Sequence, residues 1–116
     1  MANQYNIELY RMKAELCKTF ADPTRLILIS ELRTGEKVVS SLVDTLGLPQ
    51  PLVSRHLAVL RERGIVVSRR EGASVYYRLS DPKIVEACDL VHNILLNQIA
   101  NNKKFAESLI APHKLH

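Results

Sequence analysis

The polar side chains best suited to binding chemistry lie in residues 50–63, where a helix is expected. Gln50, Ser54 and Arg55 fall on the polar face of this helix. Glutamine and arginine can donate paired hydrogen bonds to base edges in the major groove of DNA, and serine can bond to a base or a phosphate. This face therefore predicts contact with double-stranded DNA, the alternative being a merely solvated helix surface.

Two further side chains of the same segment are candidates for this surface. Arg61 faces outward with the first three and is included among the DNA-binding candidates. His56 lies at the boundary between the polar and apolar faces, so it either bonds a phosphate or packs at the helix edge. The apolar face consists of Val53, Leu57 and Leu60, which recur at helical spacing and are expected to be buried.

A basic hairpin is predicted directly after this helix, over residues 65–79. Two runs rich in β-branched and aromatic residues flank a Glu-Gly turn, and Arg69 and Arg70 lie near its tip. We expect these two arginines to contact phosphate or the minor groove. Arg78 is instead a candidate to pair with Glu71 or with another carboxylate.

The chain has two cysteines, Cys17 and Cys88, each on the apolar stripe of a predicted helix. Two cysteines make no disulfide framework, and in a reducing compartment both should be thiols. The thiols could meet, within or between chains, and be oxidised or bind a soft ion such as As(III) or Cd(II) together with a third ligand. The favoured alternative is that both are small buried hydrophobic residues, and no other cofactor is expected.

The elements that must position these side chains follow a simple order. Helical periodicity is present over residues 3–20, 23–33, 39–46, 50–63 and 83–102, with the hairpin before the last helix. The third and fourth helices, joined by a turn at Gly47, form a helix-turn-helix over residues 39–63. The order predicts a mainly α fold with a small β-hairpin wing, a winged helix-turn-helix (α+β).

The last predicted helix, 83–102, is apolar on nearly all sides. A helix of this kind must be covered on both sides to be stable in water. One side can pack on its own domain, but the other requires a partner, most simply a second copy of the chain.

Length and charge agree with a small nucleic-acid-binding domain. The 116 residues are expected to form one domain, 1–116, and carry a net charge of +4. Residues 37–80 contain seven basic and three acidic side chains, whereas the flanking segments are balanced. No signal-peptide pattern or membrane-spanning apolar run is present, so a cytoplasmic protein without a membrane partner is expected.

Five motifs occur in a fixed order along most of the chain. They are Ala21-Asp22-Pro23-Thr24-Arg25-Leu26, Val53-Ser54-Arg55-His56-Leu57, Leu60-Arg61-Glu62-Arg63-Gly64-Ile65-Val66, Arg69-Arg70-Glu71-Gly72 and Tyr76-Tyr77-Arg78-Leu79. Together they closely resemble the ArsR/SmtB family of bacterial winged-helix repressors. The resemblance implies a homodimer through helices 3–20 and 83–102. It also implies that two copies of helix 50–63 enter successive major grooves of an inverted-repeat operator, and that an inducer relieves repression.

The resemblance also implies where metal ligands would stand, and the chain lacks most of them. Metal-sensing relatives carry Cys-x-Cys near the third helix, but residues 36–41 contain no cysteine. In the last helix, Asp89 and His92 have one residue too many between them for the family's Asp-x-His pattern. His113 and His116 are spaced like ligands but stand at the terminus. No metal site is therefore predicted with these residues.

Other classes of function fit the chain less well. A winged-helix module that docks proteins would more often expose apolar side chains on its recognition helix. No nucleophile–base set, glycine-rich phosphate loop or paired-carboxylate motif is present, so an enzyme is not expected. The regulator is either released by an inducer or, as an alternative, acts constitutively or responds to an organic ligand or to oxidation.

Overall fold

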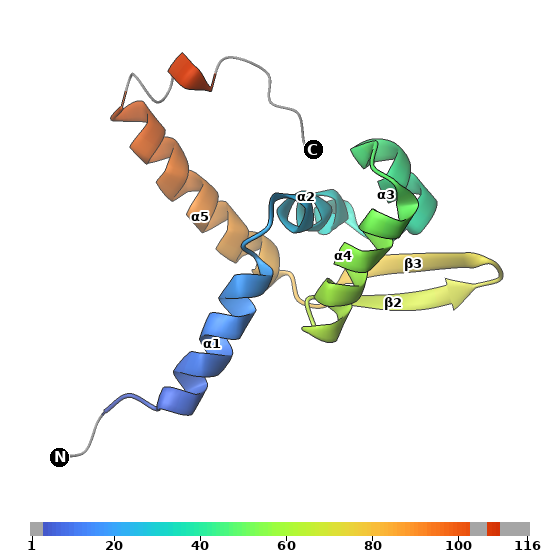
Figure 1. Cartoon of the computed structure of the whole chain (residues 1–116), viewed down its shortest axis with the longest axis horizontal. Coiled ribbons are helices and arrows are strands. Elements are labelled where there is room, and N and C mark those ends of the chain that lie inside the picture. The colour runs from blue at the N-terminus through green and yellow to red at the C-terminus, as the bar shows by residue number, and fades with distance from the viewer. Residues whose placement is uncertain (1–3, 103–106, 110–116) are drawn as a thin grey trace. The chain divides into compact units, whose positions relative to one another are not determined.

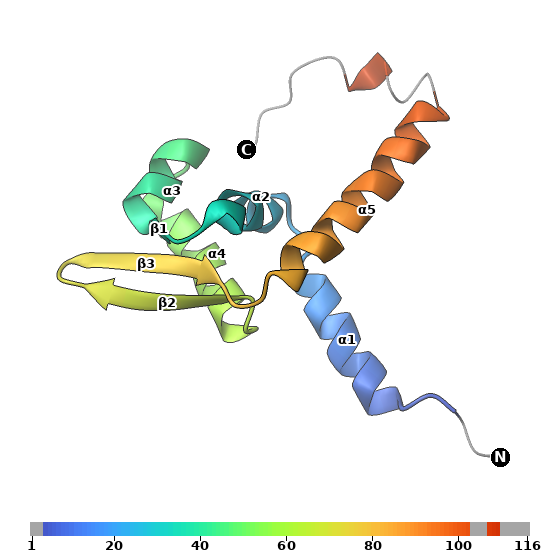
Figure 2. The same cartoon turned by 180° about the vertical axis from the view of Figure 1, so that it is seen from behind.

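The computed structural model describes residues 4–102 and 107–109 and divides the chain into two compact units, residues 1–80 and 81–116 (Figures 1 and 2). The elements of the first unit are α1 (Ile7–Thr19), α2 (Pro23–Glu31), the 3-10 turn η1 (Leu32–Thr34), β1 (Lys37–Val38), α3 (Val39–Leu46), α4 (Gln50–Glu62), β2 (Val66–Glu71) and β3 (Ser74–Leu79). The second unit contains α5 (Lys83–Ala100). The predicted order of five helices and a hairpin is confirmed, whereas one domain over residues 1–116 stays a prediction.

Side-chain caps fix where the first two helices begin. The Asn6 side chain accepts a hydrogen bond from the Leu9 amide, so α1 begins at Ile7 and not at residue 3 as predicted. Asp22 caps α2 in the same way, accepting from the Arg25 amide at 3.1 Å. This hydrogen bond fixes the first turn of α2 and keeps the Asp22 carboxylate beside that turn.

The predicted helix-turn-helix is present in α3 and α4. Gly47 joins them with φ +66° and ψ +26°, a left-handed conformation that glycine adopts without steric cost. Two prolines flank the start of α4, where the first-turn amides have no intrahelical partner to lose. The turn thereby directs the first residues of α4 away from the core.

The wing is a three-stranded antiparallel sheet in the order β1-β3-β2. The hairpin β2–β3 has the predicted position, and a two-residue turn at Gly72 and Ala73 connects its strands. The additional strand β1, which the sequence did not predict, pairs Lys37 with Tyr77 and Val38 with Tyr76. This pairing attaches the middle of β3 to the start of α3.

The core of the first unit joins α2, α3, α4 and the wing. Its buried apolar side chains are Leu28, Ile29, Leu32, Leu42, Leu46, Leu48, Val53, Leu57, Leu60, Ile65, Val66 and Tyr77. The predicted inward face of α4 is thus confirmed, and its burial fixes which face of that helix remains in solvent.

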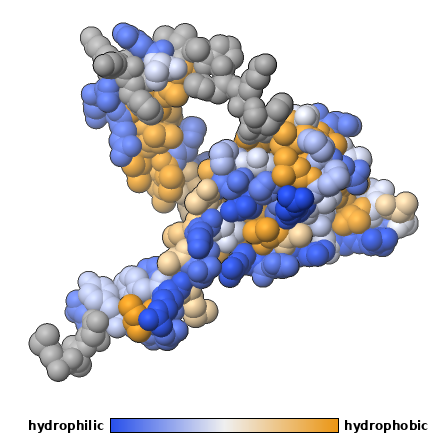
Figure 3. All heavy atoms as spheres, in the orientation of Figure 1, coloured by the Kyte–Doolittle hydropathy of each residue, from blue (hydrophilic) through white to orange (hydrophobic). Residues whose placement is uncertain are grey.

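The second unit has the opposite character. No residue of α5 is buried, and apolar atoms gather along this helix in Figure 3. Leu90, Val91 and Ile94 each expose more than half of their surface. Among the described residues, no helix combines the length and apolarity needed to cross a membrane.

Candidate DNA-binding surface

The exposed face of α4 carries the side chains predicted to contact DNA. Gln50, Arg55 and Arg61 are exposed, and Ser54 is half-buried on the same helix. Within the described residues, the side chains of Arg55 and Arg61 form no hydrogen bond or ion pair. Their guanidinium groups are therefore free to donate to base edges or phosphate oxygens without breaking an existing contact.

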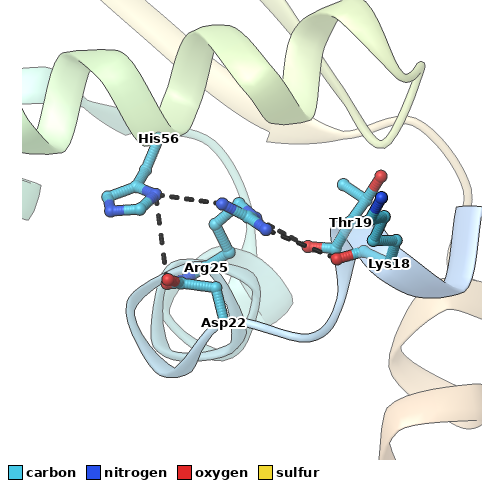
Figure 4. Close-up of polar contacts among 5 residues, drawn as sticks. All are labelled: Lys18, Thr19, Asp22, Arg25 and His56. Carbon is cyan, nitrogen blue, oxygen red and sulfur yellow. Dashed lines mark hydrogen bonds and ion pairs between the residues drawn. The ribbon is translucent and has the colours of Figure 1, made fainter. Parts of the chain in front are cut away.

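His56 points away from this exposed face. Its side chain is 15% exposed, and Nδ1 lies 3.4 Å from Nη1 of Arg25 and 3.9 Å from Oδ1 of Asp22 (Figure 4). Both partners belong to the start of α2. Of the two alternatives for His56, the structure places the side chain in the packed position between helices, and a phosphate contact by this residue stays a prediction.

The two arginines near the tip of the wing differ in their surroundings. Arg70 is exposed, and its side chain has no hydrogen bond or ion pair within the part of the chain that the structure describes. Arg69 donates from Nε and Nη2 to the two carboxylate oxygens of Glu36, at 2.8 and 2.6 Å. Its Nη1 also donates to Glu71 at 2.7 Å, and its guanidinium carbon lies 4.4 Å from the centre of the Tyr76 ring.

These contacts change the electrostatics of the wing. The hydrogen bond from Arg69 lowers the pKa of Glu36; the desolvation that opposes this shift is smaller. The hydrogen bonds to the Glu36 and Glu71 carboxylates in turn raise the pKa of Arg69. A phosphate must compete with Glu36 and Glu71 for Arg69, whereas no described carboxylate competes with it for Arg70.

The sequence did not predict the partner of Arg69 or that of Arg78. Glu36 stands 33 residues before Arg69, and no local pattern relates them. The suggested pair between Arg78 and Glu71 is not formed, because Arg78 lies opposite Val67 in the hairpin, four residues along β2 from Glu71. Glu71 pairs with Arg69 instead. Arg78 donates instead to the backbone carbonyl of Leu79 at 3.4 Å.

The two cysteines belong to different units. Cys17 is exposed on α1, and Cys88 is half-buried on α5. A single chain thus does not bury Cys17, so the interpretation of both as buried hydrophobic residues requires a partner to cover α1. The described residues contain no group of three or more histidine, cysteine or acidic side chains able to hold a metal ion, and His113 and His116 lie outside them.

Comparison with known proteins assigns the fold to a family. The model of bacterial regulatory proteins of the arsR family matches residues 22–68, from the cap of α2 through α4 into β2. A helix-turn-helix type transcriptional regulator from Methanocaldococcus jannaschii is 38% identical over 76% of this chain and 100% of its own length. The chain belongs to the ArsR family. The resemblance found in its sequence motifs is thereby confirmed.

Two further similar proteins are a repressor and a DNA-binding domain. The biofilm growth-associated repressor of Xylella fastidiosa is 39% identical over 73% of this chain and 75% of its own. The solution structure of a homodimeric winged helix-turn-helix DNA-binding domain from Mycobacterium bovis is 29% identical. It has a TM-score of 0.70 and covers 82% of this chain and 90% of that one. This chain is accordingly an ArsR-family transcriptional regulator with a winged helix-turn-helix.

Proposed function

We propose that this ArsR-family chain is a dimeric, sequence-specific DNA-binding repressor that an inducer releases from its operator. The observation that carries the proposal is the division of α4 into two faces. One face buries Val53, Leu57 and Leu60. The other exposes Arg55 and Arg61, which have no hydrogen-bond or ion-pair partner among the residues that the structure describes. A helix of this kind fits into the major groove and can offer its hydrogen-bond donors to the base edges there.

The wing supplies the second contact of the proposed complex. Its Arg70 lies opposite Val75 near the tip of the hairpin, where the free guanidinium is suited to a phosphate. A phosphate contact fixes the position of the protein on the duplex but carries no sequence information. Base readout is therefore assigned to α4, with Gln50, Ser54 and Arg55, and positioning to the wing.

The proposed dimer follows from the apolar surface that a single chain leaves in water. On α1, Ile7, Leu9 and Met12 are more than half exposed, and α5 exposes Leu90, Val91, Ile94 and others. Exposed apolar surface of this extent on two helices is typical of a protein interface. A twofold dimer of this chain would present two α4 helices to an inverted-repeat operator.

We propose that the inducer acts on the cysteine thiols. Cys17 is open to solvent in one chain, and thiolates bind soft ions such as As(III) and Cd(II) or are oxidised. A small organic inducer, or constitutive repression, is the alternative. Neither arrangement requires a histidine-based metal site.

The experiment that tests this function starts from random DNA. The reduced protein is used to select duplexes from a random-sequence library, and fluorescence anisotropy then measures binding to the selected and to a shuffled duplex. We expect an enriched inverted repeat with half-sites about 10 base pairs apart, and binding that weakens steeply with salt. Equal affinity for selected and shuffled duplexes would reject sequence-specific binding.

The same assay identifies the inducer class. As(III), Cd(II), Zn(II) and an oxidant are added separately to the complex of protein and selected duplex. Release by a thiol-directed agent that a Cys17→Ser/Cys88→Ser variant does not show assigns sensing to the thiols. Release of both proteins by the same agent excludes the thiols, and release by none directs the search to organic inducers.

A further inference from the structure

The end of α1 is held by a side chain of the next helix. Nε of Arg25 donates to the carbonyl oxygen of Thr19 at 2.6 Å, and Nη2 donates to that of Lys18 at 3.4 Å (Figure 4). The last carbonyls of a helix lack intrahelical partners, and a cation there is favourable. Arg25 therefore attaches the C-terminus of α1 to the start of α2.

The same guanidinium reaches the recognition helix. Its Nη1 faces Nδ1 of His56 at 3.4 Å, and the Asp22 carboxylate stands beside the imidazole. Because a guanidinium only donates hydrogen bonds, Nδ1 of His56 is the acceptor of any hydrogen bond in this contact. One planar group thus contacts the end of α1 on one side and the side of α4 on the other.

The remainder of α1 has little else to fix its direction. Thr19 is the only buried residue of this helix, whereas Met12 is 70% exposed. A second polar contact joins Nη2 of Arg63, at the end of α4, to the Glu15 carboxylate at 3.3 Å. Both Glu15 and Arg63 are about half exposed, so this pair is the weaker of the two connections.

We infer that Arg25 is a positioning residue that sets the direction of α1 relative to α4, and through it the distance between the two recognition helices of the dimer. The inference rests on the proposed function, in which α1 contributes to the dimer interface. If α1 belongs to the interface, any rotation of α1 against α4 moves one recognition helix relative to the other. Arg25 would then determine the half-site spacing that the dimer accepts.

DNA geometry makes this role measurable. Two half-sites in successive major grooves lie about 34 Å apart, or 10 to 10.5 base pairs. Inserting two base pairs moves one half-site by about 7 Å along the axis and rotates it by about 70°. A dimer with a fixed angle between α1 and α4 must lose contacts on such a duplex, whereas a dimer with a loose angle can follow the displaced half-site.

The test compares three duplexes built from the inverted repeat selected by the wild-type protein. They are the selected repeat, the same repeat with two base pairs inserted at its centre, and a single half-site. For the wild type we expect the insertion to weaken binding about tenfold or more. For Arg25→Gln we expect a loss of less than about threefold on insertion, and single-half-site affinity within about twofold of wild type.

Arg11→Gln is the matched control. It also removes one positive charge, but from the exposed surface of α1, where the partner of Arg11 among the described residues is Glu8 of the same helix, at 2.6 Å. The ratio of its affinities for the selected repeat and for the repeat with two inserted base pairs should equal that of the wild type. Arg25→Lys keeps the cation but not the fork that reaches three acceptors, so its ratio should fall between those of wild type and Arg25→Gln.

The outcomes separate the inference from the function on which it rests. If the wild type selects no repeat, the proposed function fails and the inference falls with it. If the wild type discriminates spacing and folded Arg25→Gln discriminates equally well, the inference is overturned while the function stands. If thermal unfolding shows that Arg25→Gln is unfolded at the assay temperature, the ratio of Arg25→Lys decides, and an unchanged ratio overturns the inference.

Discussion

Arg55 and Arg70 form no ion pair with any residue that the structure describes, and the first prediction separates their roles. Arg55→Ala should reduce affinity for the selected duplex more than for random DNA, because it removes a base contact that contributes about 1–3 kcal/mol of discrimination. Arg70→Ala should weaken binding to both duplexes by a similar factor and lower the salt dependence by about one phosphate contact. Anisotropy titrations at several salt concentrations measure both effects. Equal losses on both duplexes for both variants would contradict this division of roles.

The ion pair between Glu36 and Arg69 gives a pH prediction at the same scale. The folded pKa of Glu36 is lowered, so the unfolded chain binds the proton more tightly than the folded one. The stabilisation is present above the ordinary glutamate pKa of about 4.3 and is lost as pH falls through the lower folded value. Glu36→Gln should therefore lower the urea midpoint at pH 7, with a smaller difference from wild type near pH 3.

Glu62→Gln is the control for this effect. Glu62 is exposed at the end of α4, and its side chain makes no hydrogen bond or ion pair in the described parts of the chain. Its midpoint should stay close to that of the wild type at both pH values. A Glu36→Gln midpoint equal to that of Glu62→Gln at pH 7 would show that the ion pair adds nothing to stability.

The burial of a side chain could be predicted from the sequence where it follows a helical repeat. A contact between residues far apart in the sequence could not, because only the fold brings them together. The burial of Val53, Leu57 and Leu60 follows from helical spacing alone. The partner of Arg69 does not, because β1 brings Glu36 to the wing from 33 residues away. For His56 the sequence left two alternatives, and only the packing of α4 on α2 places its ring beside Arg25.

At the scale of elements, the turn between α3 and α4 depends on Gly47. Its φ of +66° costs an L-amino acid with a side chain about 1–2 kcal/mol, while its amide donates to the Val43 carbonyl at 2.9 Å. Apart from Gly47 and its two chain neighbours, no atom of the described residues lies within 4 Å of an added Cβ, so the strain is confined to the local backbone. Gly47→Ala should lower stability to urea by about 1 kcal/mol, and Gly47→Asn by less, since asparagine tolerates this conformation. Equal stability of Gly47→Ala and wild type would refute this account of the turn.

The order of the elements could be predicted because each helix carries its own local signal: a helical repeat of apolar residues, a capping residue or a terminating glycine. Asp22, Pro23 and Gly47 mark helix boundaries through local chemistry. The strand β1 has no such mark. It is two residues long, too short for an alternating pattern, and it exists because β3 offers a free edge for Lys37 and Val38.

At the scale of the whole molecule, the exposed apolar face of α5 predicts an assembly that one substitution should prevent. Leu95 is 45% exposed on this face. Leu95→Glu would place an unpaired carboxylate in the proposed dimer interface, at a cost of about 3 kcal/mol or more than a hundredfold in association. Sedimentation equilibrium should then give the 13.1 kDa of one chain, where the wild type gives twice that mass.

A second glutamate on the same helix distinguishes loss of the interface from a general effect of charge. Asn93 lies on the opposite, polar side of α5 and is exposed, so Asn93→Glu should leave the dimer intact. A monomeric Leu95→Glu variant should still bind the single half-site but lose the gain that the repeat provides, because only a dimer engages two half-sites. An unchanged mass for Leu95→Glu would place the interface elsewhere, and monomers with both glutamates would show that charge alone separates the chains.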